Sequence, residues 1–104
     1  MANSVIHAFS LYYKNLETLQ DAIDLINQLS GGQTIPIHTM NDCTNSIIGQ
    51  NFQSFGVACK VSTATDNFLD LLMIGPAESY WYVARINSSG TTTLKRRVTA
   101  NNFA

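Results

Sequence analysis

Few residues in this chain have the types and spacing that catalysis or metal binding requires. The histidines His7 and His38 lie far apart in the sequence, and neither has a partner at metal-ligand spacing. Asp66 and Asp70 lie near the start of a predicted strand, where loop capping is a commoner role than acid–base catalysis. No serine occupies a nucleophile elbow, and no glycine-rich loop precedes a helix. We therefore expect no enzyme activity, no metal and no cofactor.

Two short runs could instead form a binding surface. In the Tyr80-Trp81-Tyr82 run, a strand places the two tyrosines on one face and the tryptophan on the other. One face could join the core, while the other forms a subunit interface or a sugar-binding platform. The basic run at 95–97 divides in the same way, because Arg96 faces away from its two neighbours. We expect these cations to be solvated or paired with acidic side chains.

Composition excludes further classes of protein. The net charge is -1 and charged residues make up only 12% of the chain, which gives no basic face for nucleic acid. No apolar run is long enough to cross a bilayer, and no secretory signal follows Met1. We expect a product made in a cytosol that leaves it, if at all, by a route such as cell lysis. Cys43 and Cys59 fit neither a zinc site nor a redox pair, so both should be reduced.

One segment has a clear helix pattern, from about Asn15 to Leu29. Asn15 is the expected N-cap, and Ser-Gly-Gly at 30–32 should end the helix. Its apolar surface is wider than one packing surface usually needs. Two interpretations stay open: the whole surface packs on the chain's own sheet, or one arc meets the same helix in sister subunits at a three-fold axis. That arc has the 4-3-4-3 spacing of a coiled-coil seam and consists of Tyr12, Leu16, Leu19, Ile23 and Ile26.

The rest of the chain is predicted to be β-rich. Residues 4–13 alternate as an N-terminal strand or arm, Pro36 suggests an edge strand, and 43–54 are polar and irregular. Residues 55–99 should form four strands of an antiparallel meander. The predicted inner face of this layer carries Phe55, Val57, Cys59, Val61, Leu69, Leu71 and Met73, joined by Val83, Leu94 and Val98 or their alternates. The fold class is thus α+β, with an arm and helix at 1–32 and a β-rich head at 33–104.

The heptad-like helix, the amide- and hydroxyl-rich surface of low charge, and the closing hairpin YWYVARINSSGTTTLKRRV resemble small fibre proteins of tailed bacteriophages. The nearest type is the short trimeric head fibre of crAss-like gut phages. This resemblance implies a homotrimeric, structural virion component made in the host cytoplasm. It also implies an N-terminal end attached to another virion or fibre protein, and a head that adheres to host or mucosal glycans. The alternatives are a monomeric or dimeric carbohydrate- or protein-binding β module and a small cytosolic enzyme or regulator.

Overall fold

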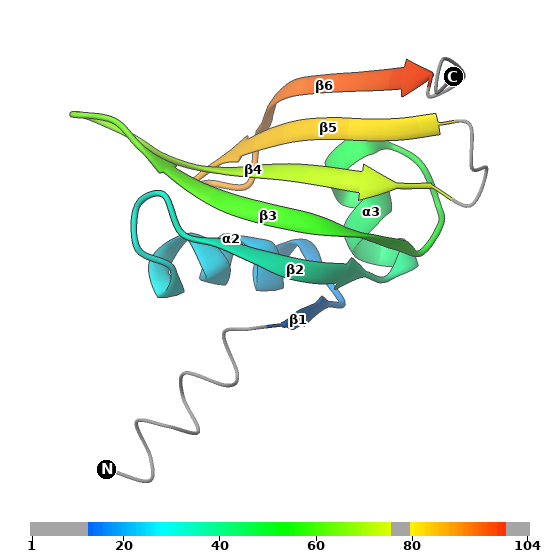
Figure 1. Cartoon of the computed structure of the whole chain (residues 1–104), viewed down its shortest axis with the longest axis horizontal. Coiled ribbons are helices and arrows are strands. Elements are labelled where there is room, and N and C mark those ends of the chain that lie inside the picture. The colour runs from blue at the N-terminus through cyan, green and yellow to red at the C-terminus, as the bar shows by residue number, and fades with distance from the viewer. Residues whose placement is uncertain (1–12, 76–79, 100–104) are drawn as a thin grey trace, which may run out of the picture.

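A single mixed sheet with two helices on one of its faces makes up the computed structural model, which describes residues 13–75 and 80–99 (Figure 1). The elements in chain order are β1 (Lys14–Leu16), α2 (Leu19–Gln28), β2 (Thr34–Thr39), α3 (Asn41–Ile48), β3 (Ser54–Ser62), β4 (Asn67–Ile74), β5 (Tyr80–Asn87) and β6 (Thr92–Thr99). The six strands lie side by side in sequence order. Only β1 and β2 are parallel, because α2 connects them, and β2 to β6 form an antiparallel meander. The predicted α+β, β-rich class is confirmed.

Helix α2 begins later than the sequence pattern predicted. The Asp21 carboxylate accepts hydrogen bonds from the backbone N–H groups of Glu17 (2.9 Å) and Thr18 (3.1 Å), which fixes Thr18 as the N-cap. Asn15 therefore lies in β1 and is not the cap. At the other end, Lys60 Nζ donates to the Leu29 carbonyl at 3.1 Å, where a cation suits the negative end of the helix dipole.

Helix α3 was missed, because residues 43–54 were predicted to be irregular. Its buried side chains recur at helical spacing and are Cys43, Thr44, Ile47 and Ile48. Gly49, with φ of 74°, ends the helix in the left-handed conformation. The Thr92 hydroxyl then donates to the Ile47 carbonyl at 2.7 Å, which ties the end of α3 to β6.

Strand β2 lies between β1 and β3, so it is not strictly the edge strand that Pro36 suggested. The proline is tolerated because β1 is short. Strand β1 pairs only with Ile37, His38 and Thr39, and Pro36 lies beyond this pairing. The half of β2 that contains Pro36 has β3 as its only neighbour among the described strands. Proline has no backbone N–H, and its absence on the side away from β3 removes no hydrogen bond of the sheet.

The register of β3 to β5 decides which side chains face the helices. One cross-strand row places Ala58, Leu71 and Ala84 beneath the helices, and the next places Val57, Leu72 and Val83 on the opposite face. We call the helix-covered side the inner face and the other the outer face. The prediction for β4 is confirmed, since its buried residues are Leu69, Leu71 and Met73.

The predicted inner face was wrong for β3. On β5 and β6 the prediction left the face open, and the alternates of Val83, Leu94 and Val98 lie on the inner side. The residues that lie on the outer face instead are Phe55, Val57, Cys59, Val61, Val83, Leu94 and Val98. Beneath the helices β3 has small side chains, Ser54, Gly56 and Ala58, which leave room for the larger residues of α2 and α3. Gly56 has no room at all, because a Cβ there would lie 1.7 Å from the Leu72 carbonyl oxygen.

Candidate functional site

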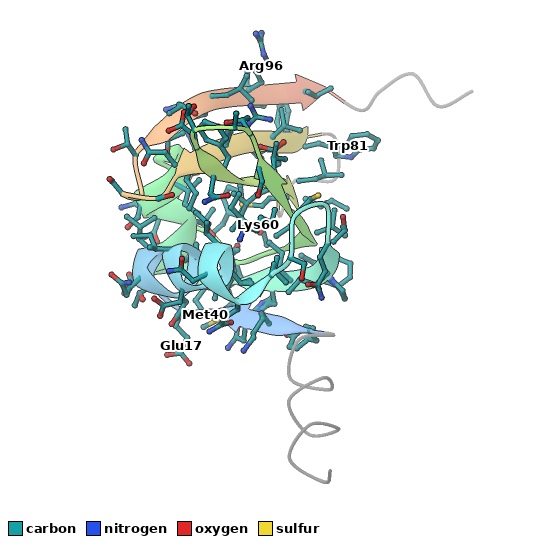
Figure 2. The ribbon with its side chains drawn as sticks, turned by 90° about the vertical axis from the view of Figure 1, so that its left-hand side faces the viewer. Glu17, Met40, Lys60, Trp81 and Arg96 are labelled. Atoms are coloured by element: carbon teal, nitrogen blue, oxygen red, sulfur yellow. The ribbon has the colours of Figure 1, made fainter. Side chains whose placement is uncertain are left out.

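The outer face is an apolar surface that no described element covers, whereas α2 and α3 cover the inner face (Figure 1). The Phe55 side chain is 60% exposed. Four more apolar outer-face side chains are 39–43% exposed, namely Val57, Ile74, Leu94 and Val98. Half-buried Trp81 lies between Ile74 and Val98 in the register and projects on the side away from α2 (Figure 2). Aliphatic and aromatic groups thus form one continuous surface.

A hollow of about 530 Å³ lies in this surface, across β3 to β6. Its walls are mainly apolar and include Val57, Leu72, Val83 and Leu94, with Cys59 beside them. The outer face therefore has both a projecting ring, that of Phe55, and a depression. These two shapes are what a complementary protein surface would engage.

One ion pair lies within the hollow, and its two opposite charges cancel. Arg85 Nε is 2.6 Å from Asp70 Oδ1, and Arg85 Nη2 is 2.9 Å from Oδ2, which is a bidentate arrangement. The hydrogen bond to the Asp70 carboxylate raises the pKa of Arg85. The guanidinium also lies 5.0 Å from the centre of the Phe68 ring. The pair therefore adds no net charge to the centre of the outer face.

The size of the outer face suits a protein interface. Five strands at about 4.8 Å spacing and eight residues at about 3.3 Å give a footprint of roughly 600 Å². If about two thirds of it is apolar, roughly 400 Å², the patch lies within the range of the largest apolar patches found on monomers. The whole footprint approaches the roughly 800 Å² that each partner contributes to a standard interface.

The predicted trimer seam of the helix already has partners inside its own chain. Leu16 lies in β1 and Ile26 in α2, and each is only 1% exposed. Leu19 and Ile23 are half-buried beneath the β5–β6 turn, where a Cβ on Gly90 would meet Ile23 Cδ1 at 2.8 Å and Leu19 Cδ2 at 3.1 Å. Tyr12 lies outside the described residues. These contacts explain the wide apolar arc without a second subunit, while trimerisation itself stays a prediction.

The Tyr80-Trp81-Tyr82 run divides between the faces as the alternation predicted. Trp81 belongs to the outer face, and both tyrosines lie half-buried on the inner side near the end of the sheet. The Tyr82 ring packs against Phe52 with centroids 5.3 Å apart. The Arg97 guanidinium lies 4.5 Å from the centre of the Tyr80 ring. The aromatic run thus contributes to two separate surfaces.

The candidate acid–base and metal residues do not come together. His7 lies outside the described residues, and His38 Nδ1 contacts the Asn15 amide oxygen at 2.8 Å. Asp66 accepts the Thr65 hydroxyl in the β3–β4 turn, whereas Asp70 pairs with Arg85. Within 13–75 and 80–99, no three His, Cys, Asp or Glu side chains gather as a metal site would require.

The two cysteines lie on opposite sides of the sheet and are free thiols. Cys43 is buried in α3, and burial, with a smaller effect of Asp21, raises the pKa of its thiol to about 12. Such a thiol is un-ionised at neutral pH and is a poor nucleophile. Cys59 is half-buried on the outer face. The intervening sheet keeps the pair from forming a disulfide within one folded chain.

No helix of the described ranges has the length and apolar character needed to cross a membrane. Comparisons with protein-family models, with curated proteins and with solved structures find no match to this chain.

Proposed function

We propose that this protein is a non-enzymatic structural subunit whose copies assemble through the outer face, and that it serves in a virion as a small trimeric phage fibre. The observation that supports assembly is the exposure of five apolar side chains on a surface without a described cover. The phage setting comes from the resemblance of the sequence pattern to short head fibres.

An identical copy is a suitable partner for this surface. The ion pair at its centre is internally neutral, so the centres of facing copies would meet without repulsion between unpaired charges. Exposed Arg96 lies on β6 at the edge of this face, where it can stay in water. The Phe55 ring and the hollow lie on the same face, so copies related by symmetry can each supply a projection and receive one. In a trimer, we expect the three outer faces to surround the axis, with α2 on the outside.

The proposed fibre attaches through its N-terminal end to another virion or fibre protein and presents its head outward. Its surface has many amides and hydroxyls and few charges, which suits weak contacts with host or mucosal glycans. Three copies on one axis would strengthen a millimolar single-site contact by roughly a hundredfold through multivalency. The virion is accordingly the expected location.

Native mass measurement and thiol labelling test the assembly together. We expect a trimer at micromolar concentration, in which Cys59 is alkylated slowly and becomes reactive when the trimer is diluted into monomers. Cys43 is the internal control, because it is buried within the chain and should stay unreactive in both states. A monomer at about 100 μM would contradict the proposal and favour the binding-module alternative. Equal Cys59 labelling in trimer and monomer would exclude the outer face as the interface.

A further inference from the structure

A second, smaller hollow lies on the opposite side of the sheet from the proposed assembly surface. Its volume is about 260 Å³, and it forms where β5 and β6 extend past the end of α3. We call it the basic hollow, and its lining residues are Ile48, Gln50, Tyr82, Lys95 and Arg97. Two cations, an amide and a phenol therefore line one small space.

The two cations share a face and have no acidic partner among residues 13–75 and 80–99. Lys95 and Arg97 are separated by one residue on β6, so their Cα atoms lie about 7 Å apart and their side chains point the same way. Both are exposed, and the single ion pair of the described residues is that of Asp70 with Arg85. The register places Arg96 on the other face of β6, and Figure 2 shows its side chain extending outward from the edge of the sheet. The hollow thus has a local positive potential in a chain of net charge -1.

Contacts within the chain hold part of the wall of the basic hollow in place. Tyr82 packs against Phe52, so its ring is held in place. The bond from the Thr92 hydroxyl to the Ile47 carbonyl holds the end of α3 against β6. Arg97 stacks on the Tyr80 ring through its face, which leaves the guanidinium N–H edge available to an oxygen acceptor. A preformed site loses less entropy on binding.

We propose that the basic hollow binds the carboxylate-bearing sugar of an acidic glycan. Arg97 donates to the carboxylate in a bidentate manner, Lys95 adds a second charge, and the Gln50 amide meets a ring hydroxyl. The Tyr82 ring offers an apolar face to the C–H groups of the sugar. The volume is below the roughly 300 Å³ at which pockets for drug-sized ligands begin, so it suits one ring of a longer chain. This inference deepens the adhesive part of the proposed function and rests on it.

Two other anionic partners fit less well. A nucleic acid requires a groove of cations that follows several phosphates, whereas this hollow has two cations. An acidic segment from a sister subunit would place Lys95 and Arg97 in the assembly interface. The inference therefore includes the expectation that changes to these residues leave the oligomer intact.

The test is a titration of the intact oligomer with 3′-sialyllactose, and a second titration with lactose as the neutral counterpart. NMR chemical shifts report the binding, and each titration is done at low salt and at 150 mM salt. We expect millimolar binding of the acidic sugar that weakens with salt, and at least tenfold weaker binding of lactose. Arg97→Gln should weaken binding of the acidic sugar by tenfold or more. Lys14→Gln, which removes the same charge from β1 at the opposite edge of the sheet, should change it by less than twofold.

Two further measurements are made on each variant. Thermal unfolding shows whether the variant is folded, and native mass shows whether it is assembled, so a loss of sugar binding can be assigned to the site itself. Absence of acidic-sugar binding at 10 mM, equal binding of lactose, or equal weakening by Lys14→Gln would each overturn the glycan site while leaving the assembly proposal intact. Loss of the oligomer in Arg97→Gln would also overturn it, because the hollow would then be a subunit contact. If the wild-type protein is a monomer yet binds the acidic sugar, the site stands and the assembly proposal fails.

Discussion

A charge placed on the outer face gives the sharpest test of assembly. Val57 lies near the middle of this face, at the side of the hollow, and is 39% exposed. In Val57→Glu, an isolated chain can direct the new carboxylate into water. We therefore expect the free energy of unfolding of the monomer to fall by only about 0.5–1 kcal/mol, as for other surface substitutions.

The cost in the assembled state should be much larger. Covering the outer face would enclose the carboxylate without a nearby cation, because Arg85 is already paired with Asp70 and Arg96 lies three strands away on β6. A buried charge without a partner costs about 3 kcal/mol or more. Three such sites in a trimer amount to about 9 kcal/mol, which corresponds to between six and seven powers of ten in the trimer association constant. Because the trimer association constant has units of M⁻², the half-dissociation concentration varies as its inverse square root and should rise roughly a thousandfold.

Native mass spectrometry over a dilution series measures this shift. Asn51→Glu is the matched control, because it adds the same charge at an exposed loop residue after α3. Burial raises the pKa of a carboxyl group, so acidification should protonate the introduced carboxylate of Val57→Glu and restore assembly as the pH falls. Wild-type assembly by Val57→Glu, or equal dissociation by Asn51→Glu, would refute the outer face as the interface.

Ile23→Asp distinguishes the outer face from the helix seam. Ile23 packs beneath Gly90 in the same chain, so this variant should lower the stability of the folded monomer in urea. Dissociation by Ile23→Asp with unchanged monomer stability would restore the helix as the subunit contact.

Three further outcomes follow from the described contacts. Gly56→Ala should lower the free energy of unfolding by about 3 kcal/mol, because the new Cβ meets a β4 carbonyl oxygen at 1.7 Å, whereas Gly31→Ala should be nearly neutral in the same urea titration. The folded-state pKa of Cys43 is raised from 9.0 to about 12, so its contribution to stability is complete below pH 9 and is lost as the pH rises toward 12. Cys43→Ala should remove that part of the pH dependence of urea unfolding. Asp70→Asn should change monomer stability by less than about 1 kcal/mol, because both side chains of the pair are over a third exposed, but should weaken assembly by more.

The sequence predicts an element well where one face of a strand is clearly more apolar than the other. In β4, Leu69, Leu71 and Met73 alternate with less buried positions, and the structure buries these three. The same alternation correctly separates Trp81 from its neighbouring tyrosines. Pattern alone fails for β3, because the larger apolar side chains of that strand lie on the outer face. The size of the side chains does not by itself show which face of a strand is buried. Burial depends on which face another element covers, and the residues that a helix covers can be small.

Helix α3 shows a second limit of reading the pattern. Its buried positions do repeat at helical spacing, through the pairs at 43–44 and 47–48, but Thr44 is polar and no long apolar run extends the pattern. The glycine at 49 and the acidic residue at 42 are helix-end signals that were available. The start of α2 could not be placed from Asn15 alone. Residues 14–16 form strand β1, which pairs with three residues of β2, so Asn15 belongs to a strand and not to the start of the helix. The basic hollow was not predicted, because Gln50 and Tyr82 reach it from distant elements.

The apolar character of the outer face is hard to explain by folding alone. The core already unites the two helices with the inner face, and it includes Ile37, Leu69 and Ile86 without help from the outer side chains. If about two thirds of the roughly 600 Å² footprint is apolar, covering it gains about 10 kcal/mol per subunit at 25 cal/mol per Å². This gain is comparable to the 4–15 kcal/mol that association costs in lost translational and rotational freedom. The balance is therefore close, and the contribution of a single well-packed side chain can determine whether the assembly forms. Phe55 is the most exposed of these groups, and it lies on the same face as the hollow that a neighbouring copy can fill. The proposed contact between subunits would account for an exposed ring at this position, with the helices left on the outside and the basic hollow open to solvent.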